Sequence, residues 1–133
     1  MSTMRLSFEF CDSDDDATNT LDEAVYENAG LEKACAMLDK LDGDIYSHLS
    51  IERDDERRMC ISGGDEHFVV IDNCELSDEK ALINPDGQLQ DIIEISTFGE
   101  ASDMPTLIVV DKAEAREAIQ CFYDGTEGLL DWY

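Results

Sequence analysis

Residues 58–72 read RMCISGGDEHFVVID, and they contain the clearest indication of the fold. Its two ends, Arg58 to Ser62 and His67 to Asp72, are rich in apolar and β-branched residues that favour strands. Gly63-Gly64-Asp65 between them is typical of a tight turn, so the stretch predicts an antiparallel hairpin. A further strand candidate, Ile45 to Arg53, precedes the hairpin across an acidic turn. The three segments together predict an antiparallel meander.

Further strand candidates lie on both sides of this meander. Met4 to Phe10 alternates apolar and polar residues, which is typical of a half-buried strand. Asp91 to Phe98 alternates in the same way, and Thr106 to Val110 is a short apolar run that predicts another strand. The region from 73 to 89 is polar and irregular, with a turn at Pro85-Asp86-Gly87.

Two segments have the spacing of amphipathic helices. Leu31 to Leu41 repeats apolar residues at intervals of three and four. Lys112 to Tyr123 does the same, with Asp111 placed to cap its beginning and Gly125 placed to end it. A third helix is predicted from Leu21, because Thr20 and Glu23 have the spacing of a capping box.

These elements predict one α+β domain spanning residues 1–133. We expect a largely antiparallel sheet of about five to six strands, with two to three helices packed on one face. A chain of 133 residues with 43% hydrophobic residues is long and apolar enough to form one core.

The charge balance restricts the classes of partner. The chain has 33 Asp and Glu against 9 Lys and Arg, a formal net charge of -24. Such a field repels phosphate backbones and anionic lipids, so we expect neither nucleic acid nor a membrane as a direct partner. A basic protein would be attracted, and its association would be fast and salt-sensitive. Solubility alone is the alternative interpretation of the same charge.

The cysteines and the N-terminal residues indicate a cytoplasmic protein. The five cysteines are widely spaced and form no Cys-x-x-Cys pair, which argues against a zinc site or a disulfide framework. Residues 1–12 lack the basic and apolar regions of a signal peptide, and no stretch has the length and hydropathy of a membrane helix.

No set of residues in the sequence predicts catalysis, a cofactor or a metal. The run Asp12 to Asp16, with Glu23, has carboxylates at four ligand positions of a calcium loop, but Ala17 stands where the loop needs glycine. We interpret the run as a solvated turn. His48 and His67 each stand alone in a strand pattern, with no nucleophile nearby in sequence. The chain is therefore predicted to be a binding protein and not an enzyme.

The C-terminal half contains a characteristic order of short segments: Asp91 to Phe98, Gly99-Glu100, Met104-Pro105, Leu107 to Val110, Ala113 to Ala118, Phe122, Gly125 and Asp131-Trp132. In this order the chain resembles immunity protein family one of bacterial polymorphic toxin systems. The resemblance extends over about residues 31 to 132 and is clearest in the last 45 or so. The chain departs from the family at Thr126-Glu127-Gly128, where family members usually carry a proline.

The resemblance implies a cytoplasmic immunity protein that binds a cognate toxin, often a nuclease or a nucleic-acid deaminase, and occludes its active site. Carboxylates of an acidic surface could occupy the basic groove of such an enzyme. The residues predicted to contact the toxin are Asp54, Asp55, Glu56, Asp65, Glu66, Glu94, Glu100 and Asp103. One alternative is a free-standing acidic DNA mimic that inhibits a nucleic-acid-binding protein. The other is an enzyme or calcium-binding module built on the Asp12 run.

Overall fold

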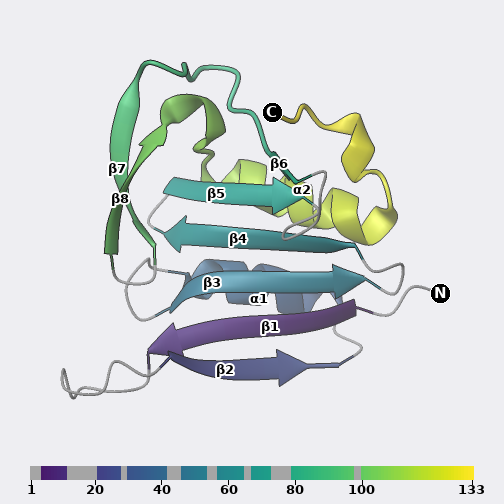
Figure 1. The fold of residues 1–133 in the computed structure, drawn as a ribbon. Coiled ribbons are helices and arrows are strands. Elements are labelled where there is room, and N and C mark those ends of the chain that lie inside the picture. The colour runs from purple at the N-terminus through teal and green to yellow at the C-terminus, as the bar shows by residue number, and fades with distance from the viewer. Residues whose placement is uncertain are drawn as a thin grey trace.

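The computed structural model describes residues 4–11, 21–27, 30–41, 46–53, 57–64, 67–72, 79–97 and 100–133. A six-stranded antiparallel sheet has the order β2-β1-β3-β4-β5-β6, and a separate two-stranded hairpin is formed by β7 and β8 (Figure 1). The strands are β1 (Met4–Cys11), β2 (Leu21–Tyr26), β3 (Tyr46–Arg53), β4 (Arg58–Gly64), β5 (His67–Asp72), β6 (Lys80–Ala81), β7 (Ile92–Thr97) and β8 (Glu100–Pro105). The helices are α1 (Leu31–Lys40) and α2 (Lys112–Asp124), with short 3-10 helices η1 (Thr106–Ile108) and η2 (Glu127–Leu129). The predicted α+β class, six strands included, is confirmed.

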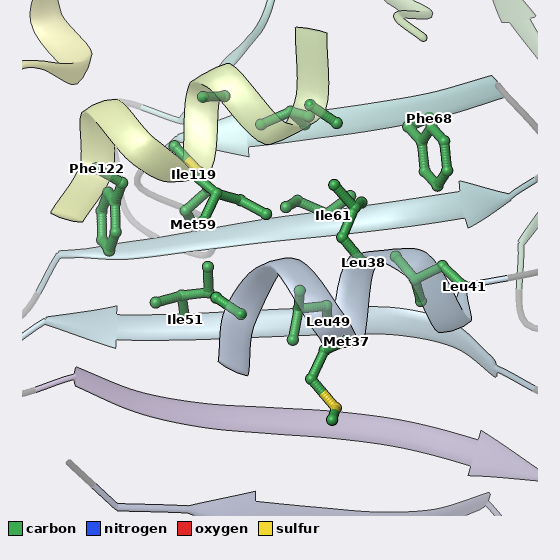
Figure 2. Close-up of a cluster of buried hydrophobic side chains, with 14 of the residues drawn as sticks. Met37, Leu38, Leu41, Leu49, Ile51, Met59, Ile61, Phe68, Ile119 and Phe122 are labelled. Atoms are coloured by element: carbon green, nitrogen blue, oxygen red, sulfur yellow. The ribbon is translucent and has the colours of Figure 1, made fainter. Parts of the chain in front are cut away.

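Both α-helices cover the same face of the large sheet and lie behind it in Figure 1. The strands point alternate side chains towards them, as period-two alternation requires. Figure 2 shows the resulting core, in which β3 to β5 meet the apolar stripes of the two helices. Its labelled members are Met37, Leu38, Leu41, Leu49, Ile51, Met59, Ile61, Phe68, Ile119 and Phe122.

The hairpin β7–β8 packs on the other face of the sheet, where β7 lies against β3 and β4 and its inner side chains reach β5. Val69 of β5 points away from the helices and forms a second cluster with Ile95 of β7 and Val109. Ile93 and Met104, which are paired across the hairpin, pack against this cluster. The hairpin therefore has an inner face that is partly buried and an outer face that turns away from the sheet.

A buried ion pair connects the C-terminal segment to the large sheet. Arg53, at the end of β3, donates two hydrogen bonds to the Glu127 carboxylate and one to the carbonyl oxygen of Phe122. Its guanidinium also lies over the Phe122 ring, 4.6 Å from the centroid. The indole N–H of Trp132 donates to the Glu127 carbonyl oxygen at 2.8 Å, and Leu82 and Trp132 form a bridge beside β6. Residues far apart in sequence thus fix the end of the chain.

The helices predicted at Leu31 to Leu41 and at Lys112 to Tyr123 are confirmed, but the helix predicted from Leu21 is wrong. Asp111 caps α2 through a full capping box with Glu114, and Gly125 ends the helix at φ +75. Leu21–Tyr26 forms β2 instead of a helix, because it pairs along its whole length with β1. A ladder of interstrand hydrogen bonds outweighs a local capping preference.

Two boundaries in the strand predictions also need correction. Gly63 and Gly64 belong to β4, where they pair with Phe68 and His67, and are not part of the turn. Thr106 to Val110 is not a strand: it is η1 followed by one bridge between Val110 and Phe68. The preceding segment, β8, takes the place of that strand by pairing with β7.

Candidate partner-binding surface

The lysine and arginine residues of the chain are largely used in internal ion pairs. Six of the nine form ion pairs with carboxylates among the described residues. Their distances run from 2.8 Å for Arg116 and Asp39 to 3.9 Å for Lys112 and Asp39. Most of these pairs lie in the large sheet, the two helices and the C-terminal segment. These six cations therefore neutralise carboxylates that lie outside the β7–β8 hairpin.

Two long stretches of the sequence, residues 6–32 and residues 81–111, carry acidic residues without any basic residue, and the structure describes most of the second. Between Lys80 and Lys112 the sequence has no lysine, arginine or histidine, but it has six carboxylates. We call residues 81–111 the acidic segment. It includes the loop before β7, the whole β7–β8 hairpin, η1 and the residue that caps α2. Its carboxylates are Asp86, Asp91, Glu94, Glu100, Asp103 and Asp111.

The hairpin places two of these carboxylates side by side. Glu94 and Asp103 are register partners across β7 and β8, and both side chains are exposed. Opposed residues in such a pair have Cβ atoms about 4.5–5.5 Å apart, and like charges there are destabilising. Ile92 and Pro105 form the next pair on the same outer face, since alternate residues share a face. The outer face thus combines an apolar pair with an acidic pair.

Exposed apolar residues flank the acidic pair. Ile92 is 51% exposed and Leu89, in the loop before it, is 47% exposed. Large apolar side chains near fixed charges are typical of a surface that binds another protein. This arrangement differs from the inner face of the hairpin, where Ile93, Ile95 and Met104 are at least partly buried.

The loop before β7 is held firmly against the residues that follow β8. The Thr106 N–H donates to the Asp91 carbonyl oxygen at 2.7 Å, and the Thr106 hydroxyl accepts from the Gln88 N–H at 3.0 Å. Gly87 makes this approach possible, because a Cβ there would lie 2.2 Å from the Thr106 carbonyl oxygen. The sequence Pro85-Asp86-Gly87 was predicted as a turn, and the structure shows why its last residue is glycine.

A cavity of about 370 Å³ lies at the base of the hairpin, beside the N-terminal end of α2. Its polar lining includes three carboxylates, and its apolar lining comes from the hairpin and the segment after η1. The lining residues are His67, Asn84, Asp86, Ile93, Thr106, Val109, Val110, Asp111 and Glu114. Burial raises the pKa of Glu114 above its ordinary value of 4.5, and the charges of Asp111 and Asp86 raise it further. The hydrogen bond from the Asp111 backbone N–H lowers this pKa, but by less than burial raises it.

The predicted contact residues have different outcomes. The structure brings Glu94 and Asp103 together on the outer face of the hairpin, and it places the backbone of Glu100 in β8. Asp54, Asp55, Glu56, Asp65 and Glu66 lie outside the described residues, so their predicted contacts stay predictions. The sequence interpretation missed Asp86, Asp111 and Glu114 as cavity residues. The absence of any basic residue between Lys80 and Lys112 was the signal that could have found this region.

The remaining candidate groups form no second site in the described ranges. His48 Nδ1 lies 3.0 Å from the Ser62 hydroxyl on the sheet face opposite the helices, whereas His67 lines the cavity. Among the residues that the structure describes, no group of three or more His, Cys, Asp or Glu is arranged to hold a metal ion. The Asp12 to Asp16 run lies outside those residues, and Glu23 is in β2.

Comparison of the chain with known protein families, with curated proteins and with solved structures found no match. Across the described part of the chain, no helix has the length and apolar character needed to cross a membrane.

Proposed function

We propose that this protein is an immunity protein that binds a basic toxin enzyme and occludes its active site. The observation that carries the proposal is the separation of charge in the chain. Basic residues are used in internal ion pairs, whereas the acidic segment, residues 81–111, has six carboxylates and no cation of its own. A surface with that composition attracts a basic protein and repels nucleic acid.

The toxin class follows from the same electrostatics. An enzyme that acts on DNA or RNA needs a positively charged groove for the phosphate backbone. An inhibitor that presents carboxylates to this groove competes with the substrate for the same cations. The resemblance of the C-terminal half to immunity protein family one supports a nuclease or nucleic-acid deaminase as the toxin, and a cytoplasmic location for the complex.

The unfavourable pairing of Glu94 with Asp103 also supports a binding role. Like charges at opposed positions of a hairpin reduce its stability, and neither carboxylate forms a salt bridge with a lysine or arginine among the described residues. A cationic partner would remove this repulsion on binding. Residues that reduce stability without a packing benefit are expected at functional surfaces.

The experiment is a binding and protection assay with the product of the adjacent gene. The tagged protein is mixed with that product at low and at high salt, and the two are also co-expressed to measure growth. We expect a stoichiometric complex that salt weakens, together with rescue of growth. Absence of both would contradict the proposal. Displacement of DNA from an unrelated basic DNA-binding protein would then favour the acidic DNA mimic.

A further inference from the structure

The two edges of the six-stranded sheet differ. β6 is the last strand on one side, and the C-terminal residues cover its outer edge. Ala81 and Tyr133 exchange two backbone hydrogen bonds, of 3.0 Å and 2.8 Å. The Ile83 N–H then donates to the Asp131 carbonyl oxygen at 3.0 Å. The protein therefore closes this edge with its own chain.

β2 forms the other edge, which is open in the part of the chain that the structure describes. All six of its residues, Leu21 to Tyr26, pair with β1 on one side. No described helix or strand lies beyond β2 (Figure 1). In an antiparallel strand, every second residue directs its N–H and C=O groups to one neighbour, and the others direct theirs to the opposite side. β2 therefore presents a row of backbone donors and acceptors to which no described strand is bonded.

β2 lacks the backbone features that usually keep an edge strand from pairing. Protected edge strands are very short, carry a bulge or contain proline. β2 is six residues long, its sequence LDEAVY has no proline, and its register with β1 runs without a shift. β1, in contrast, has an irregular register with β3 between Glu9 and Phe10. The open edge is thus regular enough to pair with another strand.

The charges of β2 select the strand that can pair with it. β2 contains Asp22 and Glu23, and it lies within residues 6–32, which have no lysine, arginine or histidine. Like charges on neighbouring strands are destabilising, whereas opposite charges are stabilising. A second copy of β2 is therefore an unfavourable neighbour, and a basic strand is a favourable one.

The cations beside this edge are already engaged. Arg5, next to the end of the β1–β2 ladder, forms an ion pair with Glu27 at 3.2 Å. Lys33 of α1 lies over the Tyr26 ring, 4.2 Å from its centroid. Val25 is 39% exposed, so the edge also offers an apolar side chain to a neighbouring strand. A strand that alternates basic and apolar residues matches both properties of the edge.

We propose that β2 is a docking edge, at which an extended basic segment of the partner protein adds to the large sheet as a further strand. This inference rests on the proposed function, and it names the surface and the binding mode of that partner. Main-chain hydrogen bonds to β2 would supply affinity, and basic side chains beside Asp22 and Glu23 would supply selectivity. The closed edge at β6 does not have this role, because its backbone groups are bonded to the C-terminal residues.

The first test uses two synthetic hexapeptides that have the same charge and side chains. Both alternate lysine and valine, but in one of them every backbone amide is N-methylated, so that it has no N–H donor for a β-ladder. Hydrogen exchange of the ¹⁵N-labelled protein is followed by NMR with each peptide at the same salt concentration. We expect the unmethylated peptide to slow the exchange of every second amide in residues 21–26 at least about tenfold, and the methylated peptide to change it less than about twofold. Unchanged exchange in β2, or equal effects of the two peptides, would overturn the docking edge.

The second test compares variants with equal charge changes. Val25→Lys places a lysine on the edge, where it opposes strand addition and repels a basic partner, whereas Gln120→Lys makes the same charge change at an exposed position of α2. We expect Val25→Lys to weaken binding of the unmethylated peptide and of the adjacent-gene product at least about tenfold. Gln120→Lys should bind both within about twofold of the unchanged protein, because distant charges are screened by salt. Equal weakening in the two variants would overturn the docking edge.

The carboxylates of the edge are tested in the same way. Asp22→Asn with Glu23→Gln removes two charges from β2, and the control, Glu117→Gln with Asp124→Asn, removes two charges from exposed positions of α2. We expect at least about tenfold weaker binding of the unmethylated peptide only in the β2 variant. The same loss in the α2 variant would contradict selection by the charges of the edge.

The outcomes separate this inference from the proposed function. Binding of the adjacent-gene product that leaves hydrogen exchange in β2 unchanged would overturn the docking edge and leave the immunity role standing. Failure of the unchanged protein to bind that product would contradict the immunity role, while slower exchange in β2 with the unmethylated peptide would still support the edge. Unfolding curves of every variant show that each one is folded.

Discussion

Substitution of Glu127 by glutamine tests whether the buried ion pair secures the C-terminal segment. Glu127 is 5% exposed and Arg53 is 9% exposed, so both charges are largely removed from water. Glutamine preserves the size of the side chain and one acceptor, but it removes the negative charge that faces Arg53. Arg57 loses a contact as well, because its Nε lies 3.7 Å from the same carboxylate.

The expected magnitude comes from the charge that is left behind. Removal of one member of a buried ion pair destabilises a protein by about 3–5 kcal/mol, since the other charge stays buried without compensation. Here Arg53 retains the Phe122 carbonyl oxygen at 2.8 Å and the Phe122 ring, so the lower end of the range applies. A loss of about 3 kcal/mol is a large part of the stability of a small domain and lowers its Tm by about 10 °C.

The assay is urea unfolding followed by tryptophan fluorescence and by circular dichroism. Trp132 is the single tryptophan, and its indole donates to the Glu127 carbonyl oxygen, so its fluorescence reports on this contact directly. The control is Glu117→Gln, the same change at an exposed position of α2, which should alter stability by less than about 0.5 kcal/mol. A loss below about 1 kcal/mol for Glu127→Gln would refute the reasoning, because it would mean that Arg53 remains solvated.

Three further predictions concern the loop, a phenol and the cavity. Gly87→Ala would place a Cβ 2.2 Å from the Thr106 carbonyl oxygen, so we expect thermal unfolding to show a loss of about 2 kcal/mol. Burial raises the pKa of Tyr123 to about 12, so stability should fall as pH rises past the ordinary value of 10.0; absorbance titration should lose its most alkaline step in Tyr123→Phe. Burial also raises the pKa of Glu114. Its contribution to stability is therefore present below pH 4.5 and is lost as the pH rises through the pKa of Glu114 in the folded protein. Glu114→Gln should remove this part of the pH dependence of Tm and keep the helix cap. An NMR titration that places the pKa of Glu114 at or below 4.5 would contradict this last prediction.

Local sequence patterns predicted the elements whose signals are short-range. The meander of β3, β4 and β5 followed from apolar runs and turn residues, and α2 followed from its spacing, its Asp111 cap and its terminal Gly125. Each of these signals lies within a few residues of the element that it specifies. The charge of -24 similarly restricts the partners of the chain without reference to its fold.

Where local signals compete, the prediction from sequence was wrong. Leu21–Tyr26 has a capping-box spacing before it but becomes β2, because β1 lies alongside it and pairs with it. The run Thr106 to Val110 is apolar enough for a strand, yet β8 is the segment that pairs with β7, and the run begins with η1. Propensity is a weak preference in such segments, and tertiary pairing outweighs it.

Residue spacing and composition are enough to predict the fold class, the two main helices and the acidic character of the chain. Which carboxylates lie together depends instead on the tertiary structure. Glu94 and Asp103 are opposed across β7 and β8, and the cavity combines residues from His67 to Glu114. Arg53 donates to Glu127, which lies 74 residues away in the sequence. These contacts depend on which distant segments are brought together by strand pairing and core packing, and no local sequence pattern specifies those segments.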